Sequence, residues 1–202
     1  MKEFKLAANK ANKSLEDNEA KTFINTIIAK NGNKALPSIV LDGPTAKTLK
    51  ILLKYGYKKA NIFIPNLSDD FQQISKLHTN TYHMSLYDFL FKNRKSKKRL
   101  GILYMDYMCS LEGNIECKPR DDLKLMFDNR MMSGNSVLAI TLSARSHVKN
   151  DTLFKHNILV MAYDYIMNLA ADNKYRLRLL TGGLYRNNKN NIYSLVFKVN
   201  LK

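Results

Sequence analysis

The polar residues with the clearest potential for chemistry stand at the ends of short apolar segments. Asp106 and Tyr107 follow the apolar run 101–105, and Asp42 follows the run 38–41. If these runs are strands of one parallel sheet, their carboxyl ends meet at the edge where open α/β sheets bind ligands. A carboxylate there can orient or deprotonate a substrate group, and a tyrosine beside it can stack on a base. Asp106 is therefore our candidate catalytic residue, although a strand-end aspartate can also cap the loop that follows it.

Short apolar segments alternate with helical patterns through most of the chain. We expect a helix from Ser14 to Gly32, and then five strands at 38–41, 61–64, 81–84, 100–105 and 136–142. Further helical patterns cover 46–55, 71–77, 86–91, 121–132 and 154–171. This alternation predicts right-handed crossovers and a mainly parallel sheet that is covered on both faces. Only a segment rich in glycine and asparagine separates the last two strands, so we expect an antiparallel hairpin from 175–180 and 193–201.

This order of elements resembles the class I S-adenosylmethionine-dependent methyltransferases, whose seven-stranded sheet ends in an antiparallel hairpin. The resemblance covers roughly residues 36–202. It implies an α/β fold, a Rossmann-like three-layer sandwich around a seven-stranded, mainly parallel sheet. We expect one methyltransferase-like domain over residues 1–202, with an N-terminal helical extension at about 1–35.

The same resemblance implies S-adenosylmethionine as the cofactor, bound at the strand ends. In the family, the loop after the first strand approaches the methionine part, the end of the second strand binds the ribose, and the residues after the third strand hold the adenine. Only one glycine remains in the first loop, and an amide stands at the ribose position with Asp69 and Asp70 nearby. An ordinary strand-to-helix turn would also suit Asp-Gly-Pro. The implied cofactor-binding residues are Asp42, Gly43, Pro44, Thr45, Asn66, Ser85, Leu86 and Asp106.

The charge of the chain favours a polyanionic partner. Lysine and arginine number 33 against 17 acidic residues, which gives a formal net charge of +16 and a field that speeds the capture of nucleic acid. A lysine-rich proteome from an AT-rich genome would give the same composition. We expect RNA or DNA to contact Arg94, Lys95, Lys97, Lys98, Arg99, Tyr107 and Arg145. His147 could act as a general base, but an exposed loop histidine is the simpler interpretation.

Several other classes of protein do not fit the sequence. Cys109 and Cys117 lie eight residues apart without a second pair, so we expect reduced thiols and neither a metal site nor a disulfide framework. No apolar stretch is long enough to span a membrane, and the N-terminus lacks the apolar region of a secretory signal. We therefore expect an intracellular protein, cytoplasmic or nuclear and not secreted. Both the Walker signature and the G-x-G-x-x-G of dinucleotide-binding folds are absent.

Together these observations predict a methyltransferase that uses S-adenosylmethionine and acts on nucleic acid, RNA or DNA. The alternative is a non-catalytic nucleic-acid-binding protein that has kept the methyltransferase scaffold. The single glycine of the first loop and the amide of Asn66 favour this alternative.

Overall fold

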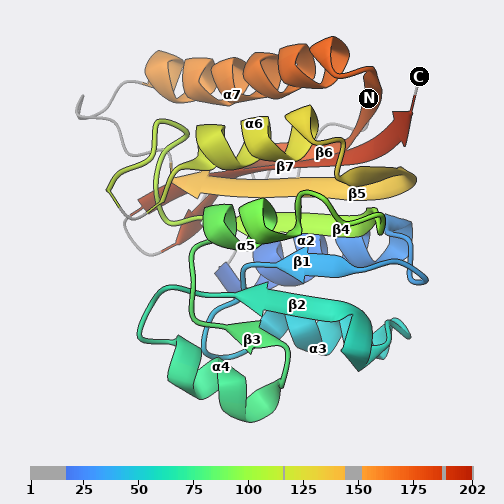
Figure 1. Cartoon of the computed structure of the whole chain (residues 1–202). Helices are drawn as coiled ribbons and strands as arrows, with labels where there is room; N and C mark the ends of the chain where they lie inside the picture. The colour runs from blue at the N-terminus through green and yellow to red at the C-terminus, as the bar shows by residue number, and fades with distance from the viewer. Residues whose placement is uncertain (1–16, 116, 144–151, 188–189, 202) are drawn as a thin grey trace.

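The computed structural model describes residues 17–115, 117–143, 152–187 and 190–201. Within these residues the chain forms a seven-stranded sheet with the strand order β3-β2-β1-β4-β5-β7-β6 (Figure 1). The strands are β1 (Ser38–Val40), β2 (Ile62–Pro65), β3 (Thr81–Tyr82), β4 (Leu100–Asp106), β5 (Met132–Ser143), β6 (Tyr175–Asn187) and β7 (Asn190–Leu201).

The directions of the strands confirm the predicted fold class. Strands β1 to β5 pair in parallel, for example Ile39 beside Leu103 of β4 and beside Phe63 of β2. The last strand, β7, is inserted between β5 and β6 and is antiparallel to both. A parallel pair requires a crossover and an antiparallel pair does not. The helical segments between the first five strands and the short link before β7 therefore account for this topology.

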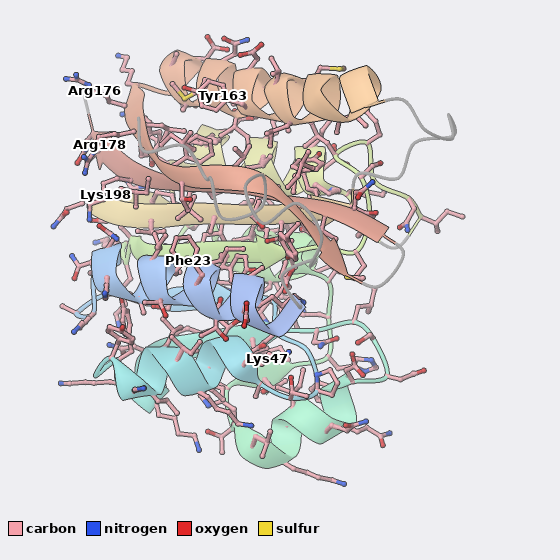
Figure 2. The ribbon with its side chains drawn as sticks, turned by 180° about the vertical axis from the view of Figure 1, so that it is seen from behind. Phe23, Lys47, Tyr163, Arg176, Arg178 and Lys198 are labelled. Carbon is pink, nitrogen blue, oxygen red and sulfur yellow. A yellow bond between two sulfur atoms is a disulfide. The ribbon has the colours of Figure 1, made fainter. Side chains whose placement is uncertain are left out.

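Helices cover both faces of the sheet. One face carries α2 (Asp17–Asn31), α3 (Lys47–Lys54) and α4 (Phe71–Leu77), and Figure 2 views the molecule from this side. The other face carries α5 (Leu86–Asn93), α6 (Pro119–Asp128) and α7 (Thr152–Asp172), which lie in front of the sheet in Figure 1. A short 3-10 turn, Lys59–Asn61, leads into β2.

The central strand β4 joins the two hydrophobic cores. Ile102 and Tyr104 belong to the core shared with α2 and α3, whereas Leu103 and Met105 belong to the core shared with α5, α6 and α7. Because side chains alternate across a strand, a strand buried on both faces must be apolar at nearly every position. This explains the unbroken apolar run that precedes Asp106 and fixes the position of that carboxylate at the end of the sheet.

Two glycines let the end of α2 approach β4 closely. A Cβ on Gly101 would lie 2.3 Å from the backbone oxygen of Asn33, and one on Gly32 would lie 2.5 Å from Ile102 Cγ1. The Gly101 amide also donates to the Pro37 carbonyl at 2.8 Å. The predicted helix end at Gly32 is confirmed, and the reason for glycine there is the contact with Ile102.

Some expected details are wrong. The glycine- and asparagine-rich segment before 193 was expected to be a loop, but most of it is strand, because β6 runs to Asn187 and pairs with β7 throughout. Leu53 and Met161 follow the apolar spacing of their helices but are 38% and 57% exposed. Helix α6 begins at Pro119 and ends at Asp128, four residues earlier than expected. Ser14 lies outside the described residues.

Candidate functional site

A cleft of about 1120 Å³ opens at the carboxyl ends of the parallel strands. Its walls come from the segments that follow β1, β2, β3 and β4, together with α2 and the start of α6. The predicted cofactor-binding residues that line it are Asp42, Gly43, Asn66, Ser85, Leu86 and Asp106, and Tyr107 lines it as well. Pro44 and Thr45 belong to the same first loop but do not line the cleft. The strand ends therefore converge as the parallel sheet requires.

The carboxylate of Asp42 is occupied by the start of α3. Its Oδ2 accepts the Leu49 amide at 2.8 Å, and its Oδ1 accepts the Gly43 amide at 3.1 Å and the Thr48 amide at 3.4 Å. The N-cap residue Ala46 has no side-chain acceptor and a left-handed backbone with a φ of 50°, so Asp42 satisfies the first amides of the helix in its place. Burial raises the pKa of Asp42 to about 6 despite these bonds.

Gly43 presents open space to the cleft. A Cβ built on this residue would meet no atom within 4 Å. Gly56 and Gly113 are the glycines with a positive φ among the described residues, so the turn at Gly43 does not demand glycine. Neither packing nor backbone conformation therefore requires glycine at this position.

Asn66 holds the loops after β1 and β2 together. Its Nδ2 donates to the Asp42 carbonyl at 3.1 Å, and its Oδ1 accepts both the amide and the hydroxyl of Ser68, at 2.8 Å and 2.7 Å. The amide that replaces the acidic residue of the family is thus engaged within the protein. Asp69 and Asp70 also line the cleft, and Asp70 makes no side-chain capping bond to α4.

Ser85 is the N-cap of α5. Its Oγ accepts the Asp88 amide at 3.0 Å, which is the N-cap bond of the helix, and its hydroxyl also donates to Asp88 Oδ2 at 2.7 Å. Leu86 follows it and is buried in the core. Both residues line the cleft, and their role in holding an adenine stays a prediction.

Asp106 stands at the end of β4 and forms an ion pair with a helix. Lys21 Nζ of α2 lies 3.3 Å from Asp106 Oδ2, and the two side chains are 19% and 14% exposed. Both residues line the cleft. Lys21 was missed from the sequence, because it lies on α2, remote in sequence from every strand end. A polar residue beside the apolar face of Ile24 and Ile28 was the only available signal.

Tyr107 points to the other face of the sheet, where it meets a buried acid. Its ring is 7% exposed and its hydroxyl donates to Asp122 Oδ2, so the structure does not offer the free ring face that base stacking requires. Asp122 lies in the first turn of α6, is 2% exposed and also lines the cleft. Burial raises the pKa of Asp122 to about 7, although the bond from Tyr107 lowers it. Sequence reasoning missed this acid, which titrates near neutral pH.

The cysteines were expected to be reduced, and the structure corrects this expectation. Cys109 and Cys117 form a disulfide. A turn at Gly113, with a φ of 77°, reverses the chain between them, and the Asn114 amide donates to the Cys117 carbonyl at 2.8 Å. Spacing alone did not reveal this turn. The disulfide closes the segment between β4 and α6 and forms part of the cleft wall.

The cleft is acidic, although the protein is strongly basic. Among the described residues that line it, the acidic side chains outnumber the lysines Lys21 and Lys118; they are Asp42, Asp69, Asp70, Asp88, Asp106 and Asp122. A concave, acidic surface attracts cations and repels phosphates. The volume of the cleft lies just above the range of typical small-molecule sites.

The basic run, residues 94–99, precedes β4 and therefore lies at the amino-terminal edge of the strands, opposite the cleft. It connects the end of α5 to the start of β4, so none of its residues lines the cleft. Arg94 stacks on the Phe91 ring at 3.4 Å from the centroid, and Arg99 donates to the Asn129 carbonyl at 3.2 Å. Lys95, Lys97 and Lys98 are exposed. Arg145 and His147 lie outside the described residues.

Neither a membrane-spanning helix nor a metal-binding cluster is found among the described residues. Their helices include none with the length and apolar character needed to cross a membrane. They contain no group of three or more histidine, cysteine, aspartate or glutamate side chains placed to hold a metal ion.

Comparison with known proteins identifies similar folds at low sequence identity. No protein-family model and no curated protein matches the sequence. Trm5b of Pyrococcus abyssi superposes with a TM-score of 0.57 and 9% identity over 89% of this chain and 48% of that chain. The chain therefore spans about half the length of Trm5b. HI0767 of Haemophilus influenzae, assigned as a methylase, gives a TM-score of 0.51 and 10% identity over 92% of this chain and 98% of that chain.

A protein of Clostridium thermocellum assigned as an rRNA methylase gives a TM-score of 0.50 and 10% identity, over 91% of this chain and 97% of that chain. At such identities the likeness establishes the fold. The chain thus has the Rossmann-like fold of the class I S-adenosylmethionine-dependent methyltransferases, as the order of its elements predicted.

Proposed function

We propose that this protein is a methyltransferase that uses S-adenosylmethionine and acts on a nucleic acid. The observation that carries this proposal is the acidic cleft at the carboxyl ends of the parallel strands, where Gly43 leaves open space and Asp106 ends the central strand. A methyltransferase fold alone does not establish an activity. The cleft adds a shape and a charge that suit a cationic nucleoside.

The residues of the cleft have distinct roles in this proposal. Gly43 admits the cofactor to the backbone of the first loop, Asp69 and Asp70 meet its ribose hydroxyls, and the Ser85–Leu86 wall holds its adenine. The bound cofactor would supply an electrophilic methyl group. Asp106 would orient the acceptor and accept its proton, because its carboxylate lines the cleft at the end of β4.

A nucleic-acid acceptor is supported by the net charge of +16 and by fold neighbours that include an rRNA methylase. The basic run 94–99 lies at the edge of the sheet away from the cleft. It would therefore contact flanking phosphates, which position a nucleic acid without reading its sequence. The acidic cleft would exclude phosphates and receive only the base.

Calorimetric titration with S-adenosylmethionine tests the proposal, on protein confirmed by mass spectrometry to be free of copurified cofactor. We expect saturable binding at one site. A protein that binds RNA or DNA but takes up no cofactor would instead be the non-catalytic alternative, which the internal bonds of Asp42 and Asn66 favour.

The Gly43→Ala variant should lose affinity for the cofactor without losing stability. The new methyl group meets no protein atom within 4 Å, and replacement of glycine by alanine at a compatible site stabilises by roughly 0.4–1 kcal/mol. The same methyl group would occupy space that the ligand needs. We expect the dissociation constant to rise about tenfold, which corresponds to about 1.4 kcal/mol, in calorimetry, with an unchanged or higher melting temperature. Equal affinity for the cofactor in both proteins would mean that no ligand approaches this backbone.

Neutralisation of Lys95, Lys97 and Lys98 by glutamine should weaken binding to nucleic acid and flatten its dependence on salt. Each phosphate contact contributes about one unit to the slope of log affinity against log salt concentration. Fluorescence anisotropy with RNA and DNA oligonucleotides across a salt series measures this slope. If wild type and triple variant gave the same affinities and slopes, the run would be a solvated loop with no nucleic-acid contact.

A further inference from the structure

Lys21 brings a positive charge into an otherwise acidic region of the cleft. It lies on α2, and its Nζ is 3.3 Å from Asp106 Oδ2. The second lysine of the cleft among the described residues, Lys118, lies at the start of α6 on the opposite face of the sheet. Lys21 therefore places a positive charge beside the end of β4, on the face of the sheet that carries α2.

The Lys21–Asp106 pair lies beside the open space at Gly43. Strands β1 and β4 are neighbours, and the Leu41 amide donates to the Tyr104 carbonyl at 2.9 Å. Asp106 is close enough to Asp42 for its charge to contribute to the raised pKa of that carboxyl. The first loop and the ion pair therefore face the same end of the cleft, where both Gly43 and Lys21 form the wall.

Adjacent opposite charges of this kind complement an α-amino acid, which carries an ammonium and a carboxylate on one carbon. An ammonium has three N–H donors, so a lysine can bind more than one carboxylate at the same time. We propose that Lys21 binds the carboxylate of the amino-acid end of S-adenosylmethionine, while Asp106 faces the ammonium. This inference rests on the proposed function and assigns a specificity-determining residue to it.

The alternative explanation is that this ion pair only holds α2 against the sheet. Ion pairs that are partly exposed contribute little to stability, and they do not distinguish one ligand from another. Binding of two ligands that differ only in the carboxylate separates this explanation from the proposal.

The experiment compares S-adenosylmethionine with its decarboxylated analogue by calorimetry on the full chain. Three proteins are titrated: wild type, Lys21→Gln and Lys30→Gln. Lys30 is an exposed lysine of the same helix, about 14 Å further along it, so its variant controls for the loss of one charge. A fourth protein, Lys21→Arg, retains the cation. Thermal melting without ligand establishes that each variant is folded.

We expect Lys21→Gln to bind S-adenosylmethionine about tenfold to a hundredfold more weakly, the range of a hydrogen bond to a charged group. The decarboxylated analogue should bind wild type and Lys21→Gln equally. The Lys30→Gln and Lys21→Arg variants should remain within about threefold of wild type, since both leave the cation in the cleft.

Other outcomes overturn the inference in distinguishable ways. Equal losses for both ligands in Lys21→Gln would mean that the substitution disturbs Asp106 and not a carboxylate contact. Unchanged affinity for S-adenosylmethionine would leave the lysine as a docking residue of α2. If wild type bound neither ligand, the proposed function itself would fail, and the carboxylate contact with it.

Discussion

Replacement of Asp106 by alanine should abolish methyl transfer while the protein stays folded. The side chain is 14% exposed at the end of β4 and lines the cleft, so its removal opens no cavity in either core. A positioned acid or base contributes typically 10²- to 10⁴-fold to a rate. We expect a loss of at least about 10²-fold in turnover, measured by transfer of labelled methyl groups to RNA or DNA.

The Asp106→Asn variant controls for shape, because it keeps the side chain and removes the charge. It should lose activity nearly as severely, while its melting temperature stays within a few degrees of wild type. Titration with the cofactor then divides the loss between binding and turnover. Full activity in Asp106→Ala would show that this carboxylate serves only to hold Lys21 or to cap the following loop.

Gly101→Ala should unfold the protein at a much lower temperature. The added Cβ would lie 2.3 Å from the backbone oxygen of Asn33, and backbone cannot move aside as the end of a side chain can. Gly101 is also tied to Pro37 by its amide. Overpacking costs typically 1–3 kcal/mol and more where nothing can yield, so we expect a loss of about 3 kcal/mol. For a chain of 202 residues this corresponds to a fall in melting temperature of roughly 6–12 °C.

Gly43→Ala is the matched control for this variant, since the same methyl group enters open space there. Calorimetric scans of the two variants should therefore diverge, with only Gly101→Ala destabilised. A Gly101→Ala protein that melted within about 2 °C of wild type would imply that the end of α2 can move away from β4 at little cost.

The topology could be predicted from the sequence because each crossover has a local signal. Apolar runs such as 100–105 contain so few polar residues that they fit only a strand in a sheet covered on both faces. The hairpin followed from the lack of a helix before β7. The length of β6 did not, because its glycines and asparagines have low strand propensity; pairing with β7 outweighs that propensity.

The candidate site was predicted only in part, for a geometrical reason. The positions of residues at strand ends, such as Asp106, follow directly from the order and direction of the strands. Lys21 and Asp122 reach the same cleft from helices on opposite faces, and their rotation about the helix axes depends on packing. The role of Asp42 depends on the left-handed backbone of Ala46, which nothing in the sequence indicated.

The position of β7 has a consequence for how the chain can fold as it is made. Among the described strands, β6 pairs with β7 alone, and β7 follows every other strand of the sheet in the chain. Helix α2, which precedes all seven described strands in the chain, contacts β7 as well, where Lys198 Nζ donates to the Asn31 carbonyl at 2.5 Å. Long-range contacts of this kind form late. Until residues 190–201 emerge, β5 has an unpaired edge and β6 has no partner in the sheet, so the nascent chain carries an aggregation-prone edge until β7 has been made.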